Sequence, residues 1–239
     1  MRYLELSLPT PEANLALEEA LLEQAERSPG GTETLRIWHG ASHFVVAGSG
    51  SRLREDVDLG ACRRDAVPVL RRVSGGGTVL QGPGCLNFTA VLSYARSPQL
   101  AHIEGAFRYV LQRARDALAE LGHTIDYAGT SDLCIGNRKI SGSGQRRKRR
   151  HVLVHGTILH GLDLARVARY LPVPRRQPLY RQHRPHGDFL ANLTIDPAAF
   201  ARALAARWNA QPNGAPWPRD EVERLARTKY ADHDWLYRR

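Results

Sequence analysis

The sequence predicts an α+β fold, and three observations support this prediction. Short apolar runs separated by glycine and proline fill the middle of the 239-residue chain, as is typical of strands. One long amphipathic segment, residues 103–121, has the apolar spacing of a helix. Both ends of the chain have helical periodicity, and strands do not alternate regularly with helices, which argues against a repeating βαβ architecture.

The first third of the chain predicts one helix and then short strands. PEANLALEEALLEQAER places Leu17, Leu21 and Leu22 at helical spacing, and Ser-Pro-Gly-Gly at 28–31 should stop this helix. Strands are expected in the apolar runs that follow, which are LRIW, HFVVAG, VPVLRRV, GTVLQ and LNFTAVLSY.

After the helix at 103–121, three more strand patterns appear, namely HTIDYA, SDLCIGNRKISG and HVLVHGTIL. Gly136-Asn137 stands where a two-residue hairpin turn would join two of them. Asp196 and Pro197 fit the N-cap and first position of a helix that runs to about Trp208. The Pro/Arg-rich stretch at 172–187 is the best candidate for a domain boundary, but the chain beyond it is too short for an independent core, so a single domain is expected.

The composition narrows the class of protein. A formal net charge of +10 should attract an anionic partner such as nucleic acid, a nucleotide or an acidic protein, although arginine-rich coding in a GC-rich genome would also produce it. Three widely spaced cysteines favour a reducing compartment, and no apolar run is long enough to cross a bilayer. A cytoplasmic protein without a signal peptide is expected.

A triple glycine, Gly75-Gly76-Gly77, stands between two expected strands. Without Cβ atoms the backbone can approach a ligand closely there, and its successive N–H groups can form a nest for an anion. Arg71 and Arg72 lie just before it. The pattern is neither a Walker loop nor a GxGxxG turn, so a plain glycine-rich turn stays the alternative.

Lys139 follows the expected hairpin turn and precedes Ser-Gly-Ser-Gly at 141–144 and the basic run RRKRR at 146–150. A lysine ammonium is a compact charge that suits a phosphate or a carboxylate oxygen. We expect the Ser-Gly-Ser-Gly stretch to be a mobile loop that closes over a ligand. The basic run fits a solvated loop, a nucleic-acid patch or a docking surface.

His155 and Gly156 fall in the apolar strand pattern VLVHGTIL. A single histidine on such a strand is usually a core side chain, and His151 on the same face comes with no H-E-x-x-H glutamate and no C-x-x-C pair. We therefore expect no metal ligands. No G-x-S-x-G elbow supports a serine hydrolase either.

Two long segments, RRVSGGGTVLQGPGCLNFTAVL and SDLCIGNRKISGSGQRRKRRHVLVHGTIL, together resemble the signature pair of the lipoate–protein ligase family, in the biotin/lipoate ligase superfamily. Family members carry an arginine with Ser-Gly-Gly-Gly, an N-D-L-x-x-x-G-x-K-x-S-G segment and an H-G-T strand, in this order. NLALEEALL, YRQHRPHGDFLANL and KYADHDWLYR extend the similarity over nearly the whole chain. The resemblance implies a mixed β-sheet flanked by helices, related to class II aminoacyl-tRNA synthetase cores and to biotin and lipoate ligases.

The resemblance also implies an activity. Lipoate, with ATP and Mg²⁺, would form lipoyl-AMP, and the acyl group would then pass to a lysine of a lipoyl domain on an E2 subunit or on a glycine-cleavage H-like protein. Position by position it implies Lys139 as the catalytic cation, in contact with phosphate and carbonyl oxygens. The same matching implies substrate or nucleotide contacts for Arg72, Ser74, Gly75, Gly76, Gly77, Thr78, Asn87, Asp132, Ser141, Gly142, His155 and Gly156. Octanoate and biotin stay open as alternative acids.

The chain departs from the family pattern in two motifs and in length. Gln81-Gly82-Pro83-Gly84-Cys85 replaces a His-Asp pair followed by Gly-Asn, and Thr130-Ser131-Asp132 keeps only the aspartate of Asn-Asp. The similarity ends where the catalytic domain ends, so we expect residues 1–239 to be a single catalytic domain without the accessory C-terminal domain. A separate accessory protein could replace that domain.

Two other functions stay open. An ATP-independent octanoyl transferase would move the acyl group from acyl carrier protein through a thioester on Cys85 or Cys134. Cys134 is separated from Lys139 by an odd number of residues, which puts the two on opposite faces of a continuous strand, although the intervening turn weakens that count. A non-catalytic nucleic-acid-binding module would use the basic run, but aromatic residues are not interleaved with it and the triple glycine would have no role.

Overall fold

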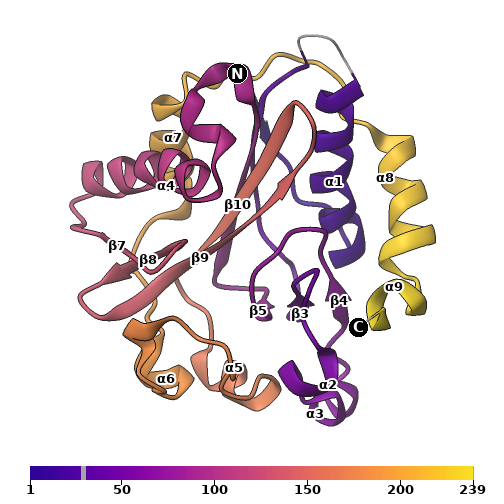
Figure 1. The fold of residues 1–239 in the computed structure, drawn as a ribbon, viewed down its shortest axis with the longest axis vertical. Helices are drawn as coiled ribbons and strands as arrows, with labels where there is room; N and C mark the ends of the chain where they lie inside the picture. The colour runs from indigo at the N-terminus through magenta and orange to yellow at the C-terminus, as the bar shows by residue number, and fades with distance from the viewer. Residues whose placement is uncertain (28–30, 239) are drawn as a thin grey trace.

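The computed structural model describes residues 1–27 and 31–238, and a seven-stranded mixed sheet forms its central layer (Figure 1). In spatial order its strands are β1 (Arg2–Glu5), β2 (Thr34–Trp38), β6 (Cys85–Ser93), β10 (His151–Leu159), β9 (Arg138–Arg147), β8 (Asp132–Ile135) and β7 (Asp126–Ala128). β1 and β2 run parallel, and every other neighbouring pair is antiparallel. The expected α+β fold with a mixed sheet is confirmed.

A second, three-stranded sheet packs on one face of the large one. Its strands are β4 (Val69–Arg71), β3 (Phe44–Ala47) and β5 (Val79–Gln81), with β3 parallel to β4 and antiparallel to β5. The short helices α2 (Leu53–Asp56) and α3 (Leu59–Arg64) connect β3 to β4. This small sheet matters for function because the triple glycine lies in the connection from β4 to β5.

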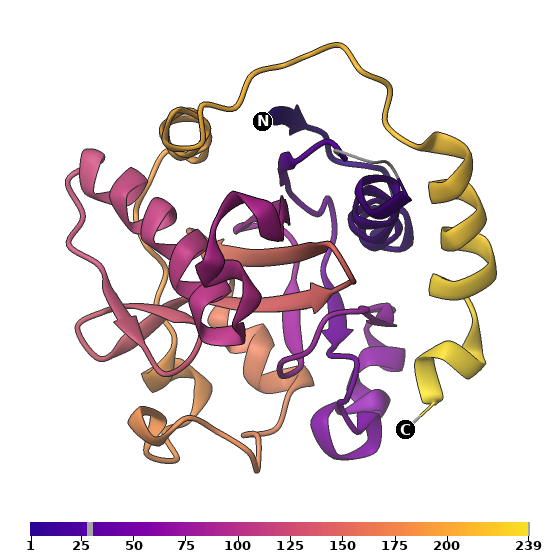
Figure 2. The same cartoon turned by 45° about the horizontal axis from the view of Figure 1, so that its top comes forward.

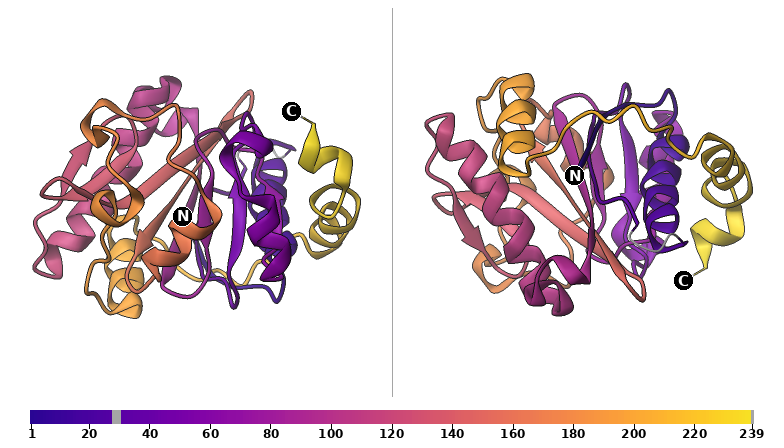
Figure 3. Two further views of the ribbon diagram at one scale, coloured as in Figure 1. Left: turned by 90° about the horizontal axis from the view of Figure 1, so that it is seen from below. Right: turned by 90° about the horizontal axis from the view of Figure 1, so that it is seen from above.

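Helix α1 (Pro11–Arg27) lies beside the small sheet on the same side of the large sheet, as Figure 3 shows. Its leucines pack with Val91 of β6 and Leu153 of β10 in one buried cluster. Two C-terminal elements cover its outer side (Figure 2), namely α8 (Arg219–Leu225) and the π-helical turn η4 (Ala226–Tyr230). The last helix, α9 (His233–Tyr237), follows them and contacts β4. The Ser-Pro-Gly of the expected helix stop, residues 28–30, lies outside the described residues.

Helices α4 (Ile103–Glu120) and α7 (Pro197–Arg207) cover the opposite face of the large sheet. Phe88 of β6, Val110 of α4 and Phe200 of α7 meet there in a single buried cluster. The expected cap of α7 is confirmed, since the Asp196 side chain accepts a hydrogen bond from the amide of Ala198 at 2.9 Å and proline stands at the start.

The segment from β10 to α7 runs past the ends of β8 and β9 (Figure 1). It contains α5 (Leu164–Tyr170), the 3-10 turn η3 (Leu179–Arg181) and α6 (His186–Phe189). Elsewhere in the chain, the 3-10 turns η1 (Tyr94–Arg96) and η2 (Pro98–Ala101) lead from β6 into α4. Arg138 Nε donates to the carbonyl of Leu190 at 3.0 Å, and Arg184 Nη2 donates to that of Asn137 at 2.9 Å. These bonds fix the segment against the β8–β9 hairpin. Among the described residues, no helix combines the length and the apolar character that a membrane span requires.

The stretch 141–144, expected to be a mobile loop, is instead the interior of strand β9, so that prediction is wrong. Its residues pair with β10 throughout, from Ser141 opposite Ile158 to Gly144 opposite His155. An apolar neighbouring strand supplies the backbone partners that a glycine- and serine-rich segment needs in order to stay extended. A lid role for this stretch therefore has no basis.

Candidate active site

Lys139 stands on β9 directly after the hairpin turn that joins β8 to β9. The turn is Gly136-Asn137, as expected, and Gly136 has a φ of +56°, which favours glycine. Lys139 Nζ lies 2.8 Å from Asp132 Oδ1 on the partner strand. The second oxygen of Asp132 accepts a 2.7 Å hydrogen bond from the hydroxyl of Tyr180. The Lys139 ammonium is thus held at a defined point, with 23% of the side chain still exposed.

The antiparallel register places a row of small and polar residues beside this ammonium. Asp132, Gly142, Thr157 and Asn87 face one another across four adjacent strands. Facing residues in an antiparallel pair project from the same face of a sheet. A Cβ added at Gly142 would lie 2.8 Å from Lys139 Nζ, so the lysine side chain folds over the bare backbone of β9.

The next row brings β9 against the triple-glycine loop. A Cβ at Gly144 would lie 2.9 Å from the carbonyl oxygen of Gly75 and 3.0 Å from His155 Nε2. The amide of Gly75 also donates to the carbonyl of Gln145 at 3.3 Å. The two glycine-rich segments predicted from the sequence therefore face each other, with the Lys139 side chain on the same face of the sheet.

Arg72 organises the triple-glycine loop through the loop's carbonyl groups. Its Nη2 donates to the carbonyls of Gly75 at 2.7 Å and Gly77 at 2.9 Å, and its Nε donates to Ser74 Oγ at 2.9 Å. Burial lowers the pKa of Arg72 to about 10, which still leaves the guanidinium charged at neutral pH. Because the peptide bonds here are trans, the carbonyls that turn toward Arg72 point the amides of Gly76 and Thr78 away from it. These N–H groups are suited to an anion.

Ser74 begins a hydrogen-bonded chain that reaches helix α1. Ser74 Oγ lies 2.7 Å from His155 Nε2, and His155 Nδ1 lies 2.7 Å from Glu18 Oε2. Burial alone would raise the pKa of Glu18, but His155, Arg36 and a hydrogen bond from Thr89 outweigh it and lower that pKa to about 2. The ionised carboxylate accepts from Nδ1–H, which orients the ring so that Nε2 faces the Ser74 hydroxyl. The chain fixes both the ring and the loop.

A second polar chain lies in the row next to Lys139. Gln81 Nε2 donates to Thr157 Oγ1 at 2.7 Å, and the Thr157 hydroxyl donates to Asn87 Oδ1 at 2.6 Å. Gln81 Oε1 and Asn87 Nδ2 are buried and have no partner among the described residues. A buried amide group without a partner is costly, so these two atoms are suited to a bound ligand or to ordered water.

Thr78 stays at the edge of the site, where its Oγ1 lies 3.1 Å from Ser51 Oγ and 3.1 Å from Asp56 Oδ2. Ser141 and Gly156 are not brought into it. Ser141 lies opposite Ile158, whose side chain belongs to the core on the α4 side. A Cβ at Gly156 would lie 2.4 Å from Phe88 Cζ, so glycine is required there for packing on that same side.

Cys134 faces Lys139 directly across the hairpin, so the expectation that they lie on opposite faces is wrong. The hairpin reverses the chain, and register rather than sequence separation decides which residues share a face. The thiol of Cys134 is buried, and burial raises its pKa. Burial also raises the pKa of Cys85, to about 12. Both thiols are therefore poorly ionised and weakly nucleophilic in this structure.

Four residues of the site were not assigned a role from the sequence. Tyr180 and Glu18 appeared only inside quoted motifs, Gln81 only as a departure from the family, and Thr157 only inside the strand pattern. A carboxylate among the leucines of NLALEEALL is the one local signal that could have singled out Glu18, because a charged group on a buried helix face requires a partner.

The basic run at 146–150 comprises the last two residues of β9 and the turn to β10, and this turn contacts α1. Lys148 Nζ lies 2.5 Å from Glu23 Oε1, and the amide of Arg150 donates to Glu26 Oε1 at 3.1 Å. Arg147 Nη2 donates to the carbonyl of Leu100 at 2.8 Å. Three of the five basic residues are thus engaged within the protein, which favours a structural turn over a free nucleic-acid patch.

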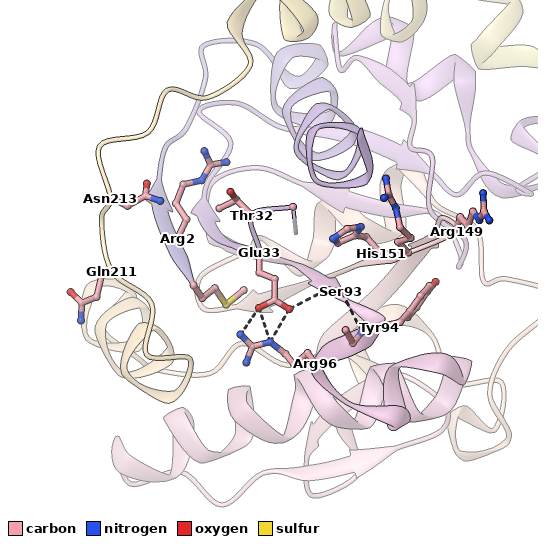
Figure 4. Close-up of a pocket in the computed structure, with 14 residues that line it drawn as sticks. Arg2, Thr32, Glu33, Ser93, Tyr94, Arg96, Arg149, His151, Gln211 and Asn213 are labelled. Atoms are coloured by element: carbon pink, nitrogen blue, oxygen red, sulfur yellow. Dashed lines mark hydrogen bonds and ion pairs between the residues drawn. The ribbon is translucent and has the colours of Figure 1, made fainter. Parts of the chain in front are cut away.

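A cavity of about 880 Å³ opens near the N-terminus (Figure 4). Arg2, Glu33, Arg96 and His151 contribute to its wall, and none of the predicted site residues does. Its most prominent charges are already paired, because Glu33 accepts from Arg96 Nε at 2.8 Å and forms an ion pair with the same guanidinium. This cavity adds nothing to the chemistry around Lys139.

Comparison with known proteins identifies relatives of this chain. The chain is 32% identical over 204 residues to a protein of Aeropyrum pernix provisionally assigned as lipoate–protein ligase A, covering 84% of this chain and 72% of that protein. It is 31% identical over 165 residues to a Mycoplasma pneumoniae protein given the same provisional assignment, covering 69% of this chain. It spans about half, 47%, of the length of that Mycoplasma relative.

Solved structures share the fold over its whole extent. A lipoate protein ligase candidate from T. acidophilum with bound lipoic acid superposes with a TM-score of 0.81 at 22% identity, covering 100% of this chain and 98% of that one. A lipoate–protein ligase A bound with ATP gives 0.82 at 23% identity, covering 99% and 98%. The family model for the lipoyl protein ligase A/B catalytic domain matches residues 10–196. These matches confirm the family inferred from the two motifs, and the chain belongs to the lipoyl protein ligase A/B catalytic-domain family.

Proposed function

We propose that this chain is an ATP-dependent lipoate–protein ligase, which activates lipoate as an acyl-adenylate and transfers it to a lysine of a lipoyl domain. The observation that carries the proposal is the Lys139–Asp132 pair, 2.8 Å apart, on the face of the sheet that meets the triple-glycine loop. Solved relatives of the same fold are described with lipoic acid or with ATP bound, which supports the choice of substrates.

In the first step, a carboxylate oxygen of lipoate attacks the α-phosphorus of ATP, and the bond to pyrophosphate breaks. In the second, the amine of the acceptor lysine attacks the acyl carbonyl, the bond to AMP breaks, and the amine loses a proton. Negative charge develops on phosphate and carbonyl oxygens in both steps. Lys139 is the fixed cation placed to stabilise it, and a preorganised charge in a partly dry site acts more strongly than one in water.

The triple-glycine loop supplies the second contribution in this proposal. Its outward amides would bind phosphate oxygens, while Arg72 and the Ser74–His155–Glu18 chain keep the loop rigid. Rigidity matters because holding two reactants at attack distance removes much of the entropic barrier. Arg72 acts here by positioning the loop, since its guanidinium donates to Ser74 Oγ and to the carbonyls of Val46, Gly75 and Gly77.

Mg²⁺ would arrive bound to the triphosphate of ATP. Asp132 is the carboxylate beside Lys139, and it already pairs with the ammonium and accepts from Tyr180. Among the described residues, no cluster of three or more His, Cys, Asp or Glu side chains is arranged to hold a metal ion. Phosphate oxygens and water would therefore supply most of the coordination, as is usual for Mg²⁺ at nucleotide sites.

The acceptor we propose is a lipoyl domain of an E2 subunit or a glycine-cleavage H-like protein. A T. acidophilum structure is described as a bipartite lipoate protein ligase and its E2 lipoyl domain, and it shares this fold at 24% identity. The proposal includes a separate accessory protein that assists activation. It also includes octanoate as an alternative acid, which is tested by replacing lipoic acid with octanoate in the assay below.

Intact-mass spectrometry of an apo lipoyl domain tests the proposal. Incubation with this protein, lipoic acid, ATP and Mg²⁺ should add the mass of one lipoyl amide, and omission of ATP should abolish the gain. If no mass is added, synthetic lipoyl-AMP replaces lipoate and ATP in a second tube. Transfer from lipoyl-AMP alone would show that activation requires a partner, and no transfer from either source would refute the ligase.

The octanoyl transferase is the second candidate, because Cys134 faces Lys139. It predicts acyl transfer from octanoyl–acyl carrier protein without ATP, and loss of that transfer in Cys134→Ser or Cys85→Ser. The raised pKa values of both thiols argue against it. The ligase predicts that either serine variant keeps nearly full activity.

A further inference from the structure

Exposed apolar side chains gather beside the hairpin that carries Lys139. Among the described residues, four large apolar side chains are strongly exposed. Leu179 is 96% exposed, while Ile135 and Val173 are each 41% exposed; all three belong to the β8–β9 hairpin or to the segment 172–190. The fourth, Ile103, is 58% exposed and lies at the start of α4. A leucine left almost fully in water next to a reactive site suggests that a partner covers it.

The hairpin and the segment 172–190 form one continuous surface. The amide of Ala191 donates to the carbonyl of Lys139 at 2.9 Å, and Lys139 pairs with Leu190 as an isolated bridge. Tyr180, the neighbour of Leu179, bonds to Asp132 at 2.7 Å, and Asp132 holds Lys139 at 2.8 Å. Tyr180, the residue next to Leu179 in the chain, is therefore two side-chain contacts away from the proposed catalytic ammonium.

The same surface is basic. Segment 172–190 contains four arginines and a single aspartate, and Arg138 adds a further positive charge from the hairpin. Of the four, Arg181 is buried and Arg175 lies 3.7 Å from Glu55. Arg138 and Arg184 bond to backbone carbonyls, which leaves their charges uncompensated. Arg176 is exposed. An exposed leucine on the same segment as exposed arginines complements a partner that presents an apolar spot within an acidic surface.

We propose that this surface, formed by the β8–β9 hairpin and segment 172–190, is the docking site for the acceptor protein in the transfer step. The inference rests on the proposed ligase function, and it specifies where the acceptor binds and by what chemistry. The acceptor lysine must come within about 3–3.5 Å of the acyl carbonyl held at Lys139, so the acceptor has to cover whatever surrounds that ammonium. Leu179 and Ile135 would be its apolar contacts, and the arginines would attract its acidic residues.

An apo lipoyl domain of an E2 subunit is the probe for the test, with Leu179→Ser and Ile135→Ser as variants and Ile103→Ser as the matched control. Each exchange shortens an exposed side chain, so folding should be preserved. Three quantities are measured: pyrophosphate release without acceptor, the acceptor KM for transfer from preformed lipoyl-AMP, and the Kd for the apo domain without nucleotide. We expect Leu179→Ser to raise the acceptor KM and the Kd by roughly tenfold, as interface anchors do. Ile103→Ser should change neither, and pyrophosphate release should be equal in all variants.

The positive charge of the proposed docking surface can be tested independently of its apolar contacts. Arg176→Glu should raise the acceptor KM, and the wild-type KM should rise with ionic strength, because screening weakens the attraction of an acidic partner. Unchanged KM and Kd in the double variant Leu179→Ser/Ile135→Ser would overturn the docking site even if the ligase is active. Loss of binding in these variants, together with no transfer in the wild type from either lipoate with ATP or lipoyl-AMP, would support the surface and refute the ligase.

Discussion

Asp132 and Tyr180 are joined by a 2.7 Å hydrogen bond between the Tyr180 hydroxyl and Asp132 Oδ2, and this contact ties a segment from after β10 to the hairpin that carries Lys139. The other oxygen of Asp132 holds Lys139 Nζ at 2.8 Å. One carboxylate thus links the proposed catalytic cation to the surface around it, and the position of Lys139 depends on parts of the chain far apart in sequence.

Replacing Lys139 with alanine should abolish most activation without unfolding the protein. A fixed charge donor in such a site typically contributes a factor of roughly 100 or more to the rate. ATP–pyrophosphate exchange with lipoate should therefore fall by about that factor. Lys148→Ala is the control, since Lys148 is also in an ion pair but sits at the far turn of β9. Full exchange activity in Lys139→Ala would remove Lys139 from the site.

Tyr180→Phe should lower activity less than the lysine change. The variant keeps the ring contact with Phe189, whose centroid lies 5.3 Å away, and removes the hydroxyl that donates to Asp132 and accepts a weak 3.7 Å hydrogen bond from the Cys134 thiol. We expect kcat to fall by a few-fold and the free energy of unfolding by about 1 kcal/mol, the usual contribution of one hydrogen bond. Tyr127→Phe, which removes a tyrosine hydroxyl bonded to the Thr130 carbonyl, serves as the control. Equal kcat values in the two variants would argue against a positioning role.

The lowered pKa of Glu18 predicts how the free energy of unfolding changes as the pH falls. Its pKa is lowered in the folded state to about 2 from the ordinary value of 4.5, so its contribution to stability is fully present above about pH 4.5 and is lost as the pH falls toward 2. The difference corresponds to roughly 3 kcal/mol. Urea unfolding at a series of values between about pH 5 and 2 should show that the free energy of unfolding of Glu18→Gln falls less steeply with acid than that of the wild type. Parallel curves would contradict the lowered pKa.

The parts of the site that could be predicted from the sequence are those with a local cause. Gly136-Asn137 marks the turn that positions Lys139, and three consecutive glycines mark a loop that approaches other atoms closely. Asp196 and Pro197 set the start of α7 for a similarly local reason. In each case the residues that indicate the feature lie within a few positions of the turn, loop or helix start that they form.

The parts that could not be predicted depend on long-range packing. His155 meets Glu18 at a separation of 137 residues, and Tyr180 meets Asp132 at a separation of 48. The stretch 141–144 reads as a flexible loop by composition, yet pairing with β10 makes it a strand. Composition describes the conformational preference of an isolated segment. In these three places, contacts with distant parts of the chain determine the conformation or the side-chain partner instead.

Substitutions at individual glycines of the loop can distinguish a glycine that is needed for folding from one that is needed for a ligand to approach the backbone. Gly76 has a φ of +97°, and a Cβ there would lie 2.9 Å from Arg72 Nη2, whereas a Cβ at Gly75 would meet no atom within 4 Å. Gly76→Ala should therefore destabilise the fold by about 1–2 kcal/mol, the cost of forcing an alanine into that backbone conformation. Gly75→Ala should leave the free energy of unfolding within about 0.5 kcal/mol of the wild type.

If the loop amides bind the phosphates of ATP, the methyl group of Gly75→Ala enters space that the nucleotide needs. The KM for ATP in the pyrophosphate exchange assay should then rise by about tenfold, a change equivalent to about 1.4 kcal/mol of lost binding. Gly50→Ala is the matched control, because a Cβ there also meets no atom within 4 Å and Gly50 lies outside the loop. A Gly75→Ala protein with wild-type stability and a wild-type KM for ATP would show that the glycine serves neither folding nor nucleotide binding, and the phosphates would have to bind elsewhere on this face of the sheet.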